Sequence, residues 1–160
     1  YQYEENDNVK ENIKNSCASD GYEKVCEFDF LDQGKVTFYK KNEVAEVHIL
    51  SVAETEILRD EHTKQLNDFF GKLWKDNLKE EEKKWPIYFT FVIFCKKSES
   101  VLAKQILEEA KGLYMCKERY RLGAIFNEKS CELNIKRIYS RSQYKEVYRK
   151  MSGELIDFAG

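Results

Sequence analysis

The sequence predicts a single α/β domain in which a mixed sheet lies between layers of helices, giving three layers. Two observations favour this fold class. Three short segments with alternating apolar residues follow one another between residues 25 and 50, which is typical of an antiparallel meander. An amphipathic segment and a nine-residue apolar run, Ile87–Cys95, come next, and a strand covered on both faces has such a run. The expected order, α-β-β-β-α-β-α-β-β-α, resembles that of restriction-endonuclease-like folds.

The first half of the chain supplies a helix and the meander. Apolar side chains at four-residue spacing predict a short helix over residues 8–18. Alternation and β-branched residues predict three strands, over 25–30, 36–40 and 44–50. Polar turn-forming residues place the two turns at Asp32-Gln33-Gly34 and at Lys41-Asn42.

The second half begins with the clearest helix, which is expected over residues 60–78. Its apolar residues fall on one stripe at helical spacing. They are Leu66, Phe69, Phe70, Leu73, Trp74 and Leu78. Pro86 disfavours a helical conformation in the residue before it, so a new element starts there. That element is Ile87–Cys95, which we expect to be a central strand.

Four further elements are expected after the central strand. Ser98 is a suitable N-cap for a helix that continues to about Met115. Residues 122–126 and 131–138 flank a four-residue turn and predict a β-hairpin. A last helix is expected over residues 142–151.

The ends of the chain and its composition limit the possible functions. At 160 residues, one domain over 1–160 is the default expectation. Residues 1–8 and 152–160 are expected to be frayed, and an initial Tyr indicates a piece excised from a longer protein. The net charge of −2 gives no general attraction to nucleic acid or anionic lipid. No apolar run approaches the roughly 20 residues of a membrane span, and no signal peptide is visible.

The five cysteines are scattered and show no metal-ligand spacing. We expect buried, reduced thiols, which predicts a reducing compartment and a cytoplasmic location. A catalytic Cys–His pair is disfavoured because Cys26 and Cys95 lie among aromatic residues, where burial raises the pKa of a thiol.

One alternative is a divergent metal-dependent nuclease. Such an enzyme needs an acid on the second strand of the meander and Glu-x-Lys on the third, so that the carboxylates bind Mg²⁺. The candidates are Asp29 or Asp32, together with Glu46 and His48. Histidine replaces the lysine and Asp29 lies on the first strand, so the pattern is half complete. The simpler interpretation is that Asp29 and Glu46 occupy solvent-facing positions of half-buried strands.

A second alternative is nucleic-acid binding through the C-terminal region. Basic residues alternate there with tyrosines. Such basic side chains can bind a phosphate backbone, and the tyrosine rings can stack on bases. The basic residues are Lys136, Arg137, Arg141, Lys145, Arg149 and Lys150. The same residues could contact anionic lipid or a protein partner. The simpler interpretation is a helix with its tyrosines packed inward and its cations in water.

Three segments resemble the cytosolic N-terminal domain of Firmicutes rhomboid-family intramembrane proteases. These are residues 43–50 (Glu-Val-Ala-Glu-Val-His-Ile-Leu), 61–70 and 87–94, and a hairpin around 125–129 is also similar. The resemblance spans roughly residues 20–138. It implies a regulatory or ligand-sensing role, which can include the sensing of metal ions. The catalytic residues of these proteases lie in membrane helices that this sequence lacks, so none is carried over.

The sequence therefore predicts a non-catalytic accessory or regulatory binding domain with no cofactor and no metal site. Mg²⁺ belongs only to the nuclease alternative. The expected partner is another protein or the rest of the parent chain, and nucleic acid is the less favoured partner.

Overall fold

The computed structural model describes residues 1–98, 119–136 and 145–160. Its helices and strands, in chain order, are η1 (Glu5–Asp7), α1 (Val9–Ser19), β1 (Glu23–Asp29), β2 (Lys35–Glu43), β3 (Glu46–Glu54), β4 (Ile57–Leu58), α2 (Asp60–Asn77), η2 (Glu82–Lys84), β5 (Ile87–Cys95), β6 (Lys97–Ser98), β7 (Arg119–Asn127), β8 (Glu132–Lys136) and α4 (Lys145–Ala159). The helix predicted after Ser98 lies outside the described residues. None of the described helices combines the length and the apolar character that a membrane span needs.

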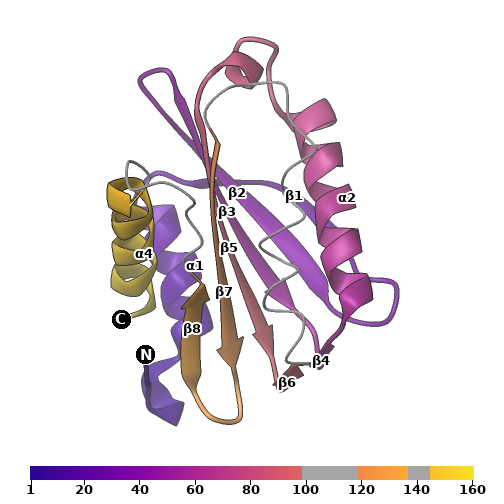
Figure 1. The fold of residues 1–160 in the computed structure, drawn as a ribbon, viewed down its shortest axis with the longest axis vertical. Coiled ribbons are helices and arrows are strands. Elements are labelled where there is room, and N and C mark those ends of the chain that lie inside the picture. The colour runs from indigo at the N-terminus through magenta and orange to yellow at the C-terminus, as the bar shows by residue number, and fades with distance from the viewer. Residues whose placement is uncertain (99–118, 137–144) are drawn as a thin grey trace.

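Six of the described strands form one mixed sheet in the order β1-β2-β3-β5-β7-β8, and β4 pairs separately with β6. β1, β2 and β3 form an antiparallel meander, β3, β5 and β7 run parallel, and β8 returns antiparallel to β7. α1 and α4 lie on one face of the sheet and α2 on the other (Figure 1). The predicted fold class, a single α/β domain with a mixed sheet between layers of helices, is confirmed for the described residues.

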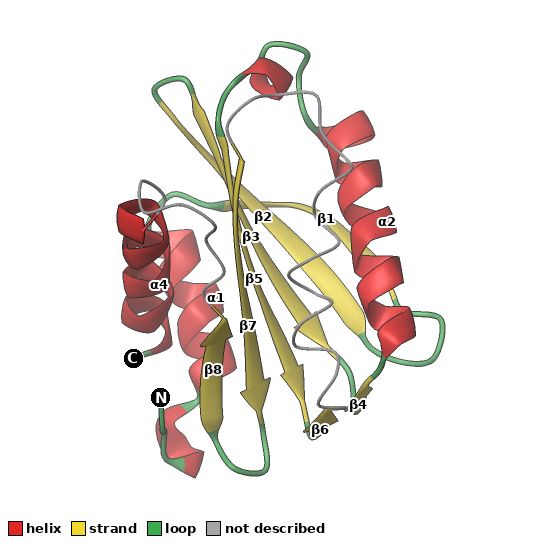
Figure 2. Ribbon diagram, in the orientation of Figure 1, coloured by secondary structure: helices red, strands yellow, loops and turns green. Residues whose placement is uncertain are grey.

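Alternate residues of each strand build two separate apolar layers. On one face, α2 packs Phe70 and its neighbours against the sheet. On the other face, Ile13 of α1 and Leu155 of α4 are buried over the same strands. Ile49 and Leu50, neighbours on β3, therefore belong to opposite layers. Figure 2 shows the sheet enclosed between these helices.

β5 lies in the interior of the sheet with a parallel neighbour on each side. Ile87 pairs with Val47 of β3 and with Arg119 of β7, and the pairing continues to the far end of the strand. Phe91 faces the α2 layer and Val92 faces the α1/α4 layer, and both are fully buried. The prediction for this apolar run is confirmed, because a strand with two covered faces needs apolar residues at nearly every position.

The turn between β2 and β3 differs from the prediction. Lys41 and Asn42 belong to β2, and the turn is formed by Val44 and Ala45, with Ala45 at φ 54°. The sequence predicts that β-branched Val44 begins a strand, but this side chain is 96% exposed at the tip of the hairpin. The longer β2 adds three cross-strand pairs to the hairpin, Lys41 with His48, Asn42 with Val47 and Glu43 with Glu46.

Both ends of the chain are anchored, and the expectation that 1–8 and 152–160 are frayed is wrong. Leu133 N–H donates to Tyr1 O at 2.8 Å and Tyr3 N–H donates to Cys131 O at 2.9 Å, so the first residues pair with the edge of β8. At the other end, α4 continues to Ala159, which is fully buried against α1. The polar composition of the first residues concealed their backbone pairing.

Candidate metal-binding site

The clearest group of metal-ligating side chains lies at the tip of the β2–β3 hairpin. Glu43 ends β2, Glu46 begins β3, and the two residues are cross-strand partners. His48 lies two residues after Glu46, so its side chain points to the same face of the sheet. Val47 between them is buried in the α2 layer, which places the three polar side chains on the α1/α4 face.

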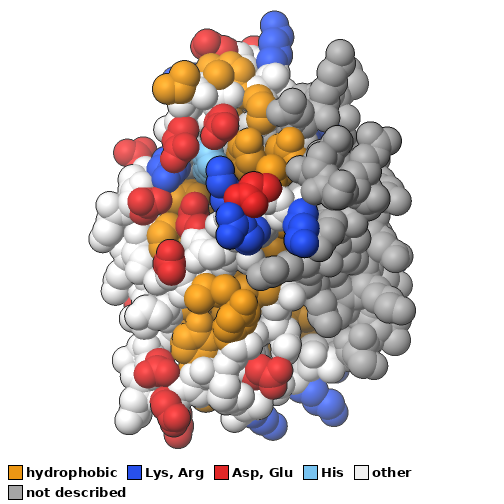
Figure 3. All heavy atoms as spheres, turned by 60° about the vertical axis from the view of Figure 1, so that its left-hand side comes forward, with side chains coloured by type: hydrophobic (Ala, Val, Ile, Leu, Met, Phe, Trp, Pro, Cys, Tyr) orange, Lys and Arg blue, Asp and Glu red, His pale blue; other side chains and the backbone are white. Residues whose placement is uncertain are grey.

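Single donor atoms of Glu43, Glu46 and His48 all lie within 4.8 Å of one another. His48 Nε2 is 3.0 Å from Glu46 Oε2 and 3.7 Å from Glu43 Oε2. The exposed side-chain fractions are 16% for His48, 35% for Glu46 and 52% for Glu43, so the group is open to solvent on one side. Figure 3 shows this face, where a histidine side chain reaches the surface beside acidic and basic side chains.

Aromatic stacking fixes the orientation of the histidine. The His48 ring lies flat on the Tyr88 ring, with centroids 4.7 Å apart and planes 8° apart. Tyr88 in turn stacks on Tyr120 at 4.9 Å, because β3, β5 and β7 place these residues in register. The Tyr88 hydroxyl also donates to Glu46 Oε1 at 3.4 Å. The stack holds His48 Nε2 toward the carboxylates.

The spacing of these donors suits one metal ion. Two ligand atoms about 2.1 Å from an ion are separated by about 3.0 Å in octahedral and about 3.4 Å in tetrahedral coordination. The two separations from His48 Nε2, 3.0 and 3.7 Å, span these values, and the shorter one is at the same time a hydrogen-bond contact between His48 and Glu46. One imidazole and two carboxylates also bring two negative charges together, and a divalent cation would neutralise them.

The nuclease set is not assembled. In the meander, Asp29 pairs with Lys35, and Lys35 pairs with Glu54 at the end of β3. Glu46 begins the same strand, so Asp29 and Glu46 are separated by almost the full strand length, about 25 Å. Asp32 follows β1 at that same far end. The residues proposed to share a Mg²⁺ ion therefore do not meet, and only Glu46 and His48 of the four candidates lie together.

Asp32 instead contacts the buried histidine of α2. Its Oδ2 lies 2.8 Å from His62 Nε2, and Thr55 Oγ1 lies 3.2 Å from the same nitrogen. The other ring nitrogen, Nδ1, accepts the backbone N–H of Arg59 at 2.9 Å. Because the acid and the hydroxyl share one nitrogen, the imidazole cannot pass a proton from Thr55 to Asp32 through opposite sides of the ring. The arrangement joins structural elements and is not an acid–base–nucleophile relay.

The basic C-terminal residues do not assemble into a described patch. Arg137 and Arg141 lie outside the described residues, as does the side chain of Lys136. Lys145, Arg149 and Lys150 are exposed on α4. Arg149 makes a two-pronged contact with Glu146 on the same helix, at 2.6 and 3.1 Å, so its charge is locally compensated.

The cysteines that the structure describes carry no disulfide. Cys17 and Cys95 are buried, whereas Cys26 and Cys131 are half-buried. Burial raises the pKa of Cys17, Cys26 and Cys95 to about 11, so these thiols are protonated at neutral pH. Protonated thiols are poor nucleophiles and poor metal ligands.

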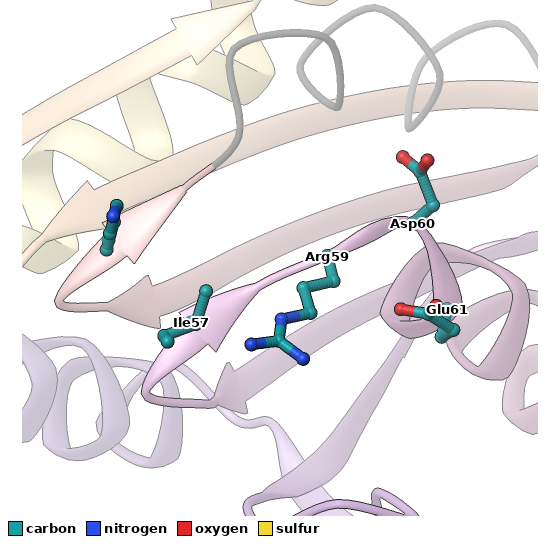
Figure 4. Close-up of a pocket in the computed structure, with 5 residues that line it drawn as sticks. Ile57, Arg59, Asp60 and Glu61 are labelled. Atoms are coloured by element: carbon teal, nitrogen blue, oxygen red, sulfur yellow. The ribbon is translucent and has the colours of Figure 1, made fainter.

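A separate hollow of about 430 Å³ lies before the first turn of α2 (Figure 4). The described residues that line it are Ile57, Arg59, Asp60, Glu61 and Lys97. The Arg59 side chain points away from the carboxylate of Asp60. The lining therefore contains both acidic and basic side chains. Among the described residues, these side chains do not converge on one point where a ligand could be held.

Comparisons with known proteins leave the family open. No family model and no curated protein matches this chain. The chain is similar to the solved structure of EndoMS in its apo form, with a TM-score of 0.38 and 14% identity. The match covers 75% of this chain and 48% of that one, so the chain spans about half the length of EndoMS. A similarity at this level identifies no shared site, and the resemblance to rhomboid-protease domains stays a prediction.

The sequence reasoning missed Glu43. It placed a turn at Lys41-Asn42, which separates Glu43 from the strand pairing that brings it to Glu46. The signal that could have found it is the run Glu43-x-x-Glu46-x-His48. A two-residue turn inside that run places the two glutamates opposite each other, and the i,i+2 spacing adds the histidine on the same face.

Proposed function

We propose that this chain is an accessory binding domain whose ligand is a divalent transition-metal ion, held by Glu43, Glu46 and His48. One observation supports the proposal most: three side chains of ligating type, fixed by a hairpin and an aromatic stack, place their donor atoms within 4.8 Å of one another.

The donor set selects a class of ion. Imidazole suits zinc, copper, iron and nickel, whereas carboxylates also suit manganese. Mg²⁺ and Ca²⁺ prefer all-oxygen sites, so His48 disfavours them. Three protein ligands leave further coordination positions for water or for a partner's side chain. We therefore propose Zn²⁺ or Mn²⁺ rather than Mg²⁺.

The regulatory part of the proposal rests on the resemblance of residues 43–50, 61–70 and 87–94 to N-terminal domains of rhomboid-family proteases. In that setting the rest of the parent chain, or a protein partner, would respond to the metal-bound state. The described cysteines form no disulfide, which fits the proposed reducing, cytoplasmic setting for the domain.

Isothermal titration of the purified chain with Zn²⁺, Mn²⁺ and Mg²⁺ tests the metal site. We expect one ion per chain for Zn²⁺ or Mn²⁺ and no measurable heat for Mg²⁺. His48→Ala and Glu46→Gln should each weaken binding by about tenfold or more, a loss of about 1.4 kcal/mol. Glu56→Gln, at an exposed glutamate beyond the other end of β3, is the matched control and should bind as the wild type does.

Circular dichroism of each variant separates loss of the site from loss of the fold. Absence of binding by the wild-type chain would contradict the proposal. So would unchanged affinity in folded His48→Ala, because the ion would then be held elsewhere.

A further inference from the structure

We propose that Lys41 is a built-in competitor for the metal ion and that Asp20 favours metal binding by drawing the Lys41 ammonium away from Glu43. This inference rests on the proposed metal site and assigns its regulation to two residues outside the ligand set. It also connects the site to the end of α1.

The two carboxylate oxygens of Glu43 face different side chains. Oε2 lies 3.7 Å from His48 Nε2, on the side of the proposed ion. Oε1 lies 3.2 Å from Lys41 Nζ. Lys41 is the cross-strand partner of His48, so its side chain emerges on the same face of the sheet. An ion bound to Glu43 would thus face the Lys41 ammonium across a single carboxylate.

The ammonium is confined close to the site. The Lys41 side chain is only 16% exposed, and its stem passes over Gly21, where a Cβ would lie 3.5 Å from Lys41 Cδ. Its Nζ sits 5.1 Å above the centre of the Tyr22 ring. A lysine side chain is ordinarily cationic at neutral pH, and this ammonium lies between the carboxylates of Asp20 and Glu43.

Asp20 holds the other side of the same ammonium. Its Oδ2 lies 2.8 Å from Lys41 Nζ, closer than Glu43 Oε1. Asp20 is the C-cap of α1, and the neighbouring Tyr22 hydroxyl donates to Glu154 of α4 at 2.8 Å. The position of Lys41 is therefore set partly by the helix layer, and a movement of α1 against the sheet would change the competition for Glu43.

This arrangement predicts effects of opposite sign for the two residues. Removing the Lys41 charge frees Glu43 and removes a repulsion, so Lys41→Met should bind Zn²⁺ about tenfold more tightly. When the Asp20 charge is removed, Glu43 is the remaining carboxylate that contacts the Lys41 ammonium. Asp20→Asn should therefore bind Zn²⁺ more weakly by about threefold to tenfold. If Asp20 acts through Lys41, its substitution should have no effect once Lys41 is methionine.

The test is a double-mutant cycle measured by Zn²⁺ titration of the wild type, Lys41→Met, Asp20→Asn and the double variant. Lys41→Arg keeps the charge and should bind like the wild type. Lys24→Met removes an exposed lysine from the same face of the neighbouring strand β1 and should change affinity less than twofold, about 0.4 kcal/mol. Thermal unfolding confirms that each variant is folded.

Two results would overturn the inference while leaving the metal site intact. One is unchanged affinity in Lys41→Met although His48→Ala still weakens binding by about tenfold or more. The other is an equal loss from Asp20→Asn with and without Lys41, which would reveal only a general charge effect. If neither the wild type nor Lys41→Met binds Zn²⁺ or Mn²⁺, the proposed function itself fails.

Discussion

His62 Nε2 lies 2.8 Å from Asp32 Oδ2, so the first turn of α2 is tied directly to the turn between β1 and β2. The His62 side chain is 2% exposed and also meets Thr55, just after the end of β3. Its Nδ1 accepts the Arg59 N–H, one of the backbone groups that a helix start leaves unpaired. A single imidazole therefore joins three elements at this end of the sheet.

Loss of this imidazole should be costly. His62→Ala leaves the Arg59 N–H without its acceptor and opens a cavity beneath Phe30, whose ring packs on the imidazole at 4.8 Å. We expect the free energy of unfolding to fall by about 2–4 kcal/mol. Urea unfolding followed by circular dichroism measures it, with exposed Lys64→Ala on the same helix as control. Equal stability of the two variants would show that the contacts of His62 are dispensable.

The contribution of Asp32 should depend on pH. Burial alone would raise the pKa of Asp32, but the Gln33 N–H and His62 outweigh burial and lower it below the ordinary value of 3.8. A lowered pKa in the folded state means stability that is present above pH 3.8 and is lost as the pH falls through the folded value. Asp32→Asn should thus be slightly less stable than the wild type at pH 7, by less than about 1 kcal/mol for this half-exposed group. Urea unfolding at pH 7 and pH 3 should show the difference shrinking in acid, and a difference that grows in acid would refute this sign.

Glu82 should matter more than its neighbours in the charged run before β5. Its buried carboxylate accepts Lys40 Nζ at 2.8 Å, Asn42 Nδ2 at 2.6 Å and the Lys79 N–H at 2.8 Å. Glu82→Ala leaves the Lys40 ammonium, itself 16% exposed, without this partner, and should cost about 3 kcal/mol. Glu80→Ala is the matched control, because Glu80 is 89% exposed, and should leave the urea midpoint unchanged. Similar midpoints for both variants would mean that the cluster adds nothing.

Two glycine-to-alanine substitutions should act in opposite directions. Gly34 has φ +112°, and an added Cβ would overlap the carbonyl oxygen of Glu54. Gly71 lies inside α2, where an added Cβ meets nothing within 4 Å. Gly34→Ala should destabilise by more than about 2 kcal/mol, whereas Gly71→Ala should stabilise by about 0.5–1 kcal/mol. Differential scanning calorimetry gives both shifts in Tm, and a raised Tm for Gly34→Ala would show that the turn adapts.

The sequence was sufficient to predict the elements that have a clear apolar periodicity. The apolar run of β5 and the apolar stripe of α2 each indicate which faces are buried, since every position must suit the layer that it faces. The position of the β2–β3 turn was harder to predict. Lys41 and Asn42 have turn-forming character, but the chain turns at Val44 and Ala45 because pairing over the whole length of β2 outweighs local preference.

The candidate site was half predicted. Glu46 and His48 share a face by spacing alone, which sequence reasoning can use. The sequence alone could have excluded Asp29 and Asp32 from a site with Glu46. In an antiparallel meander, the end of the first strand and the start of the third strand lie at the two different ends of the sheet. The roles of Lys41 and His62 depend on partners far away in the chain, Asp20 and Asp32, and no local pattern shows such contacts.

The interior position of β5 has a consequence for the rate at which the chain folds. The meander β1–β2–β3 forms from neighbouring residues, whereas Ile87 must find Val47 on one side and Arg119 on the other. Long loops must close before these parallel pairs gain any stabilising contact, and such topologies fold slowly. We expect the hairpin that carries Glu43, Glu46 and His48 to form in milliseconds or less and the parallel strands to assemble last.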